Sequence, residues 1–413
     1  MRILSGRVAA AHVRALVERG SQLADVEPVV REIVDDVRGG GDKSLRSYAE
    51  RLDGLERDSP FRVARSEMQE SWDASPPRLR SALREAARNI RRFCEWQKPK
   101  QWKHGSGGVS VGQIVRPLDP VGCYVPGGRH PLASTVLMTV IPAQVAGVKN
   151  IRIVSPKPRP EVLAAAAMLG VHEFYRVGGA QAIAALAYGT ESIPRVDKIV
   201  GPGNSYVTAA KKLVSFDCAI DFLAGPTEIV VLSDSGTPEF IAADLVAQAE
   251  HDPETIAIFI TTSRSLGKAV ASRADKFSAS NSIARESLSR NGAVLIAGST
   301  EIALDWANAI APEHITVERK HLPFINNAGS IFVGDYSAQA AGDYASGPNH
   351  VLPTAGVARF RGGLSVLDFV KTITVQELSS KGLRRLAPAI ECLAEIEGLV
   401  AHAESIVVRT RHA

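Results

Sequence analysis

Cysteine, long apolar runs and an excess of charge are all scarce in this sequence, and each absence excludes a class of protein. The four cysteines, Cys94, Cys123, Cys218 and Cys392, are far apart and form no paired-ligand spacing, so neither a disulfide framework nor a thiolate metal site is indicated. No apolar run reaches the roughly 18 residues of a membrane span, and the N-terminus lacks the apolar core of a signal peptide. We therefore expect a soluble, cytoplasmic protein that does not bind membranes.

Charge of one sign is not in excess, because 48 basic and 44 acidic residues are well mixed and give a net charge of +4. That balance is too dispersed to indicate nucleic-acid binding. Two motifs are also missing. The stretch GPGNSY begins like the dinucleotide fingerprint but has Tyr206 where a third small residue belongs, so motif evidence for a nicotinamide cofactor is weak. The H-E-x-x-H pattern of zinc proteases does not occur.

The pattern of the 413 residues changes along the chain, and the length is sufficient for two or more domains. Residues 1–104 are mostly helix-forming, and the residues after about 364 again look helical. Between about 109 and 335, short β-rich segments alternate with helical ones. This alternation predicts an α/β fold with doubly wound parallel sheets, and the number of strands fits two sheets as well as one.

Four glycine-containing turns are predicted at the carboxyl ends of strands: YVPGG at 124–128, GGAQ at 178–181, GPGN at 201–204 and AGPTE at 224–228. In open α/β sheets that edge binds ligands, since helix N-termini and backbone amides converge there. Any one of these turns is explained by tight chain reversal alone. Four of them together favour a ligand crevice.

A polar side chain stands in the apolar stripe of the helix that ends in VAQAEHDPE. At 100° per residue, Leu245 lies about 40° to one side of Ile241 and Gln248 about 20° to the other. Gln248 should therefore face the core, where its amide needs polar partners.

Four of the ten histidines stand among carboxylates, amides and glycine turns: His251, His314, His350 and His402. Asp343 and Glu313 add carboxylates to this set. Imidazole nitrogen and carboxylate oxygen without cysteine suit zinc or a harder divalent ion. Adjacent Glu313 and His314 offer a base near neutrality and a carboxylate that can activate water. The spacing of these residues alone favours a metal-dependent hydrolase and a dehydrogenase equally.

These residues lie in stretches that resemble the histidinol dehydrogenase family, whose members use zinc and NAD. The stretches occur in family order from about residue 25 to the C-terminus: VGCYVPGGRHPLASTVLM, IPAQVAGV, GGAQAIAALAYGT, VDKIVGPGNSYVTAAKK, IDFLAGPTEIVVLSD, DLVAQAEHDPE, APEH, GDYASGPNHVLPT, VQELS and EGLVAH. The family's cofactor site lacks the usual dinucleotide fingerprint, which accounts for its absence here.

The resemblance implies a role for each matching residue. The implied ligands of one zinc ion per subunit are Gln248, His251, Asp343 and His402, and these also contact the substrate. Glu313 and His314 match the catalytic pair, and His314 also touches the substrate. The other implied substrate contacts are Thr227, His350 and Glu397, and the implied NAD contacts are Tyr124, Gln181 and Asn204.

The resemblance also implies two Rossmann-like domains in an intertwined homodimer. The implied division is an N-terminal extension, 1–20; a discontinuous first domain, 21–124 with 229–363; a second domain, 125–228; and a helical C-terminal segment, 364–413, that contacts the partner subunit. His402 would reach the site of the partner.

The activity implied is the four-electron oxidation of L-histidinol through L-histidinaldehyde to L-histidine with two NAD⁺. Three positions depart from the commonest family pattern: Thr227 replaces serine, Asp252 glycine and Pro348 threonine. Two of these lie near substrate positions, so a related zinc and NAD enzyme for another polar alcohol is an alternative. A zinc hydrolase without nicotinamide and a non-catalytic nucleotide-binding protein are the alternatives of other classes.

Overall fold

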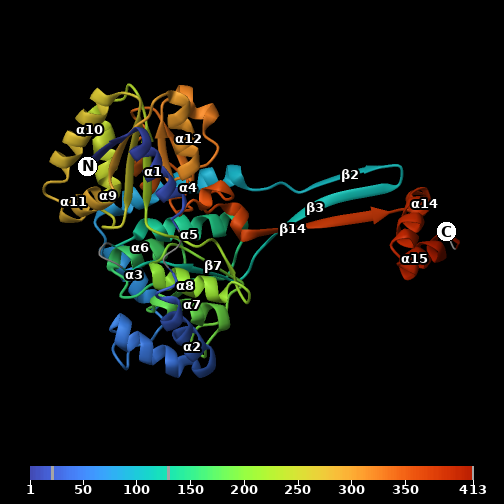
Figure 1. Cartoon of the computed structure of the whole chain (residues 1–413). Helices are drawn as coiled ribbons and strands as arrows, with labels where there is room; N and C mark the ends of the chain where they lie inside the picture. Colours follow the sequence, from blue (N-terminus) through green and yellow to red (C-terminus); the bar gives the residue numbers. More distant parts are fainter. Residues whose placement is uncertain (20–22, 128–130, 412–413) are drawn as a thin grey trace.

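Two parallel sheets and one antiparallel ribbon make up the structure, a computed structural model that describes residues 1–19, 23–127 and 131–411. The sheets and their helices lie together in one body, and the ribbon extends far from it (Figure 1). Two helices near the C-terminus, α14 and α15, lie at the distal end of the ribbon.

The first sheet has six parallel strands in the order β1–β11–β10–β9–β12–β13. Their bounds are β1 Arg2–Ser5, β9 Glu228–Leu232, β10 Ile256–Thr261, β11 Ala293–Ile296, β12 His314–Val317 and β13 Ser330–Val333. Alternate strand residues face two separate apolar clusters, as the period of two requires. One cluster includes α1 (Gly6–Val17) and α12 (Thr300–Ile310). The other includes α9 (Pro238–Ala249), α10 (Arg264–Phe277) and α11 (Ser282–Arg290).

The second sheet has five parallel strands in the order β6–β5–β4–β7–β8. Their bounds are β4 Val121–Tyr124, β5 Ile151–Val154, β6 Glu173–Tyr175, β7 Lys198–Val200 and β8 Ala219–Ile220. One apolar cluster joins the sheet to α4 (Pro77–Gln97), α5 (Ala133–Ala146) and α6 (Pro160–Met168), on which α3 (Arg65–Ala74) also packs. The other joins it to α2 (Glu27–Tyr48), α7 (Gly179–Tyr188) and α8 (Ser205–Val214).

The predicted α/β architecture of doubly wound parallel sheets is confirmed, and the described residues form two such sheets. Each β-rich segment expected between residues 151 and 335 contains a strand. In each sheet the winding direction changes beside one central strand. In the five-stranded sheet, β5 and β7 lie on opposite sides of β4, and in the six-stranded sheet, β10 and β12 lie on opposite sides of β9. Such switch points open a crevice between neighbouring strand ends.

Packing groups residues 1–124 differently from the expected division. Residues 1–17 supply β1 and α1 to the six-stranded sheet, so they are part of that unit rather than an extension. The helices between 27 and 97 pack on the helices of the five-stranded sheet, and β4 is its central strand, although 21–124 was expected to join 229–363. The surface against which each of these helices buries its apolar face depends on distant parts of the chain. The local sequence pattern does not identify that surface. The expected boundary at 20/21 falls outside the described residues.

The ribbon is formed by β2 (Trp102–Ser106), β3 (Val109–Pro117) and β14 (Val370–Leu378), with β3 in the middle. The expectation of a wholly helical segment at 364–413 is therefore wrong for β14. Its strand partner lies more than 250 residues earlier in the chain, and most of its side chains are exposed, so no burial pattern marks it. Helices α14 (Ser380–Ile396) and α15 (Val400–Arg411) follow as expected. Within the described ranges, no helix is long and apolar enough to cross a membrane.

One carboxylate fixes the turn after β9. Glu318 accepts hydrogen bonds from Ser233 Oγ at 2.9 Å and from the backbone amides of Asp234 at 2.8 Å and Ser235 at 3.1 Å. Burial alone would raise the pKa of Glu318, but its hydrogen bond with Lys320 and these donors lower the pKa to about 2. Its stabilising effect is therefore present above the unfolded-state pKa of 4.5 and is lost as the pH falls towards 2.

We expect Glu318→Gln to lower the free energy of unfolding at pH 7 by about 1–2 kcal/mol, because charged acceptors make the stronger hydrogen bonds. The difference from the parent should narrow between pH 4.5 and pH 2, where the parent loses the same charge. Unfolding curves at pH 7 and pH 3 measure this, with the exposed Glu70→Gln as the matched control. A difference that does not change with pH would contradict this account.

Candidate active site

The candidate site lies where the two sheets approach each other. His350 joins them: its Nδ1 lies 2.7 Å from the backbone oxygen of Asp343, and its Nε2 lies 3.3 Å from Oγ1 of Thr135. Thr135 is in the first turn of α5, the helix that follows β4 in the chain. Asp343 in turn contacts His314, the first residue of β12. The carboxyl edge of the five-stranded sheet therefore faces the amino end of β12.

Three of the four glycine turns follow strands as predicted. They come after β4, β6 and β7, although Gly128 of the first lies outside the described residues. The turn at 224–228 differs, because Glu228 opens β9 and the turn is at the amino end of that strand. Here the chain crosses from one sheet to the other, so the turn still borders the site.

Glu313 and His314 are buried, with 7% and 3% of their surfaces exposed. Oε2 of Glu313 accepts a hydrogen bond from the backbone amide of Glu228 at 3.0 Å, which joins the starts of β12 and β9. Burial raises the pKa of Glu313 to about 7, partly opposed by the neighbouring His314. This carboxyl group is therefore close to the protonation midpoint that a proton-transfer group needs.

His314 lies between two carboxylates. Its Nε2 is 3.4 Å from Oδ1 of Asp343, and its Nδ1 is 3.8 Å from Oε2 of Glu313. Burial alone would lower the pKa of His314, but the two carboxylates raise it above its usual value. Its buried Nδ1 has no hydrogen-bond partner among the described residues, so it can take a proton from a bound molecule.

Gln248 points inward as periodicity predicted: it is 2% exposed, and its Nε2 donates to Oδ2 of Asp343 at 2.9 Å. Burial would raise the pKa of Asp343, but His314 and then Gln248 lower it, so the carboxylate stays charged. His251 is exposed two residues after the end of α9. Asp252, next to it, is also exposed, and its Oδ1 accepts from the Glu254 amide at 2.9 Å.

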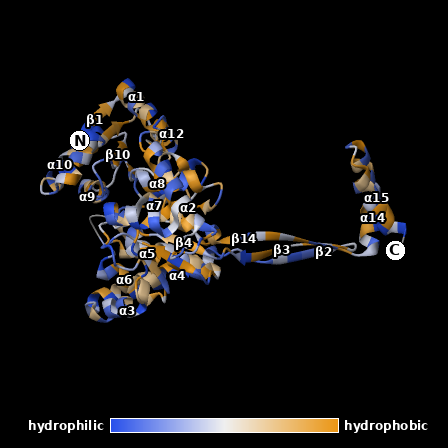
Figure 2. Cartoon of the chain, turned by 90° about the horizontal axis from the view of Figure 1, so that it is seen from below, coloured by the Kyte–Doolittle hydropathy of each residue, from blue (hydrophilic) through white to orange (hydrophobic). Residues whose placement is uncertain are grey.

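The other expected ligand and one expected substrate contact lie elsewhere in the chain. Glu397 directly follows α14 and His402 is in the first turn of α15, and both are exposed. Two views at right angles place these helices far from the body (Figures 1 and 2). Over the described ranges, no group of three His, Cys, Asp or Glu side chains could hold a metal ion. Gln248 and Asp343 meet within one chain, whereas His402 does not join them.

Of the remaining substrate candidates, Thr227 is half-buried just before β9. Burial lowers the pKa of His350, which keeps its ring neutral. Since a backbone oxygen can only accept, Nδ1 of neutral His350 donates to Asp343, and Nε2 accepts from the Thr135 hydroxyl. His350 is thus held in one tautomer at the boundary of the sheets.

The three cofactor candidates follow strands of the five-stranded sheet. Tyr124 ends β4, Gln181 is in the first turn of α7 after β6, and Asn204 caps α8 after β7. The Tyr124 hydroxyl accepts from the amide of Gly179 at 3.2 Å, which places it beside the start of α7. Asn204 is exposed, with its Oδ1 accepting from the Val207 amide at 3.1 Å.

Gln181 is fixed by a residue that sequence patterns do not single out. Oδ2 of Asp53 accepts from the Gly178 amide at 2.9 Å and from Nε2 of Gln181 at 3.1 Å. Oε1 of Gln181 is buried without a partner among the described residues. A Cβ on Gly179 would lie 2.6 Å from that oxygen, and φ is +61° there, so glycine is required. Asp53 lies in a helical stretch far from every motif, and nothing local marks it.

Comparisons with known proteins bear on this arrangement. A family model for histidinol dehydrogenase matches residues 17–410. The histidinol dehydrogenase of Methanothermobacter thermautotrophicus is 48% identical over 414 residues and covers 97% of each chain. That of Geobacter metallireducens is 46% identical over 413 residues, which is 96% of this chain and 95% of the relative.

A solved structure agrees with the sequence comparisons. The crystal structure of histidinol dehydrogenase from Elizabethkingia anophelis matches with a TM-score of 0.95 at 36% identity, covering 100% of this chain and 98% of the other. The match covers the whole chain, including the ribbon and the distal helices. The family resemblance carried by the sequence motifs is thereby confirmed, and the chain belongs to the histidinol dehydrogenase family of oxidoreductases.

Proposed function

We propose that this chain oxidises L-histidinol through L-histidinaldehyde to L-histidine in the cytoplasm, using two NAD⁺ and one zinc ion per subunit. The observation that carries the proposal is the buried pair Glu313 and His314 beside Asp343, at the boundary between the sheets. A proton acceptor and a carboxyl group with a pKa of about 7 are what the two successive oxidations require.

Gln248, His251, Asp343 and His402 of the partner subunit would hold the zinc ion. Their amide oxygen, imidazole and carboxylate donors suit zinc, and Gln248 already lies against Asp343 inside the body. When bound, zinc supplies a template that orients the imidazole and amino nitrogens of the substrate. Gln248 is buried and Asp343 is half-buried, so much of the removal of these two side chains from water precedes the arrival of a ligand.

A homodimer would bring the distal helices to a partner's body. The ribbon and the two helices expose apolar side chains, among them Trp102 at 46%, Leu393 at 60%, Ile396 at 77% and Val400 at 74%. Apolar side chains exposed to this extent favour a covering partner, and Figure 2 colours much of the distal helices as hydrophobic. Glu397 lies between these two helices and His402 lies in the second, so the contact would carry both into the second site.

NAD⁺ would lie at the carboxyl edge of the five-stranded sheet, against Tyr124, Gln181 and Asn204. The orphaned Oε1 of Gln181 fits a donor such as the nicotinamide amide, since a buried acceptor without a partner is costly. Burial raises the pKa of Tyr124 to about 12, so its hydroxyl stays protonated and can donate.

The two oxidations divide between the catalytic residues. When bound, NAD⁺ would supply the hydride acceptor for both oxidations. In the first, His314 would take the proton of the substrate hydroxyl as the carbinol carbon is oxidised to the aldehyde. In the second, Glu313 would take a proton from the water that attacks the aldehyde, and His314 would take the hydroxyl proton of the resulting hydrate as it is oxidised to the acid. Thr227, His350 and Glu397 of the partner subunit would fix the remaining polar groups of the substrate.

The test is an assay with L-histidinol and NAD⁺ on protein whose zinc content has been measured. We expect two NADH for each L-histidine formed, and loss of turnover when a chelator strips the zinc. Product formed without NAD⁺ would favour the hydrolase alternative. Absence of NADH with histidinol but turnover of another polar alcohol would identify a related enzyme of different specificity.

A further inference from the structure

A buried ion pair that the proposed reaction does not use lies at the carboxyl edge of the five-stranded sheet. Lys211 Nζ, from α8, contacts Oδ1 of Asp221, the residue that directly follows β8. The two side chains are 2% and 0% exposed, so neither charge meets solvent. Removing two charges from water is costly, and apolar side chains of similar size often give the same stability or more. The pair is therefore better explained by what it holds in place.

Both members of the pair bind the backbone of one residue, Gly201, which directly follows β7. Oδ2 of Asp221 accepts from the Gly201 amide at 2.8 Å, and Nζ of Lys211 donates to the Gly201 carbonyl oxygen at 3.0 Å. Gly201 has a φ of +118°, and a Cβ there would lie 2.1 Å from the backbone oxygen of Tyr124. The residue lies beyond the strand pairing of β7, so the ion pair supplies the backbone partners that a neighbouring strand would otherwise give.

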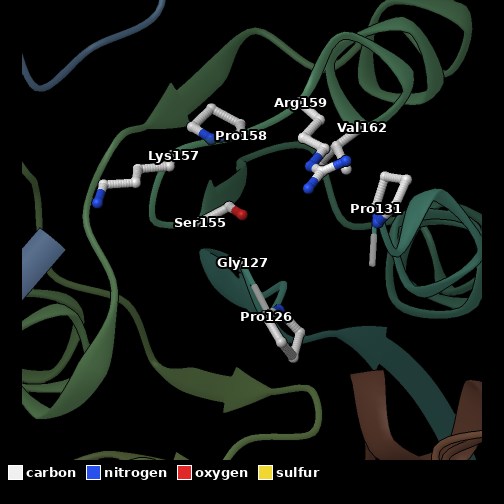
Figure 3. Close-up of a pocket in the computed structure, with 8 residues that line it drawn as sticks. All are labelled: Pro126, Gly127, Pro131, Ser155, Lys157, Pro158, Arg159 and Val162. Atoms are coloured by element: carbon white, nitrogen blue, oxygen red, sulfur yellow. The ribbon is translucent and has the colours of Figure 1, made fainter. Parts of the chain in front are cut away.

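Gly201 opens the turn that carries Asn204, the N-cap of α8 and a proposed NAD contact. This turn meets the end of β4, at the point where the winding of the sheet changes between β4 and β7. Ligands of open α/β sheets bind in the crevice at that point. The hollow drawn in Figure 3 lies on the other side of β4, between the turns after β4 and β5, and neither member of the pair lines it. The pair therefore acts on the β7 side of the crevice.

Asp221 is also the first residue of the segment that crosses from this sheet to β9 of the six-stranded sheet. A hydroxyl on α8 binds the middle of this segment, because Thr208 Oγ1 donates to the carbonyl oxygen of Ala224 at 3.0 Å. The segment leads to Glu228, whose amide binds Oε2 of Glu313 at 3.0 Å. One buried pair thus joins the turn of a proposed cofactor contact to the segment that leads to the catalytic carboxyl group.

We propose that Lys211 and Asp221 are positioning residues, which fix the turn after β7 against the crossing segment and so hold the dinucleotide beside the catalytic pair. The inference rests on the proposed function, because it places NAD⁺ against this turn. Both side chains are buried behind the backbone, so they act through Gly201 rather than by touching cofactor or substrate. Without the grip on its carbonyl group, the turn would be free to shift, and binding would have to order it again.

Dinucleotide binding tests the pair without turnover. By calorimetry on the zinc-loaded protein, we expect Lys211→Met to weaken NADH binding by about tenfold or more, because methionine fills the space but cannot donate to Gly201. Methionine leaves Asp221 as an unpaired buried charge, so the double variant Lys211→Met with Asp221→Asn is measured as well. Asparagine still accepts from the Gly201 amide, and we expect the same loss of affinity. Parental affinity in the folded double variant would overturn the proposal.

Lys198→Met is the matched control. Lys198 is the first residue of β7, at the opposite edge of the same sheet, and pairs with Asp368 at 3.3 Å, with both side chains 10% exposed. The variant also removes a largely buried cation, but Asp368 keeps its contact with Arg361. We expect a lower unfolding temperature and unchanged NADH affinity. Equal losses of affinity in Lys198→Met and Lys211→Met would show a general structural effect and overturn the positioning role.

Steady-state kinetics give an independent signature. We expect Lys211→Met to raise KM for NAD⁺ by about tenfold or more, while KM for L-histidinol and the zinc content stay within about twofold of the parent. Similar increases in both KM values would contradict a role at the cofactor turn. A parent protein that neither binds NADH nor oxidises L-histidinol would refute the proposed function, whereas parental NADH affinity in the variants would refute only the positioning role.

Hydrogen exchange on the parent protein requires no variant. The Gly201 amide is bonded to a buried carboxylate, so we expect peptides that span 199–208 to show this amide protected before NADH is added, with little change afterwards. An amide that exchanges freely until NADH binds would mean that the pair does not hold the turn. That result would overturn the proposal even if neither variant folds.

Discussion

Replacing His314 with asparagine is expected to lower kcat for L-histidinol by about a thousandfold, which is within the usual range for a positioned general base. Asparagine keeps a polar side chain near Asp343 but cannot accept the hydroxyl proton. The buried Nδ1 of His314, which lacks a partner among the described residues, is the group removed. NADH formation under saturating substrate measures the effect, and unchanged zinc content shows that the site remains assembled.

Glu313→Gln should have a different effect, because this residue serves the second oxidation. We expect the variant to oxidise supplied L-histidinaldehyde a hundredfold or more slowly, since an amide cannot take a proton from the attacking water. The first oxidation should be affected much less, so single-turnover experiments would accumulate the aldehyde. Glutamine can still accept the backbone hydrogen bond from Glu228 that now anchors Glu313. Equal losses of both steps in both variants would contradict this division of roles.

The sequence predicted the parts of the fold that local patterns determine. Gln248 was placed in the core from the helical period alone, and it is buried against Asp343. The strands between 151 and 335 carry apolar residues on both faces because helices cover both sides of their sheets, and that composition is visible in the chain.

Features that depend on distant contacts were not predictable in the same way. Strand β14 has mostly exposed side chains and pairs with β3, so neither apolar alternation nor a nearby partner marks it. Asp53 orients Gln181 from more than 120 residues away, and its helix gives no sign of that contact. The placement of helices α2–α4 on the five-stranded sheet likewise depends on which surface their apolar faces meet.

The separation of His402 from Gln248 leads to a further large expected effect. Gln248→Ala and His402→Ala should each be inactive alone, because each removes one proposed zinc ligand from every site. A hybrid dimer would combine the intact body of the His402→Ala chain with the intact distal helix of the Gln248→Ala chain. If subunits exchange at random in a twofold dimer, half of the dimers are hybrids with one good site, and mixing should restore about a quarter of the parent activity.

Zinc content distinguishes shared sites from simple rescue of folding. Each variant alone should bind little zinc, and the mixture should regain zinc in proportion to its activity. A mixture of Gln248→Ala with Asp343→Ala provides the matched control, because both substitutions damage the body of the same chain and no hybrid contains an intact site. Hybrids verified by mass that remain inactive would mean that His402 does not complete a partner's site. Recovery in the first mixture only would place the ribbon and its helices in the active site of a second subunit, which explains why the chain extends so far from its own body.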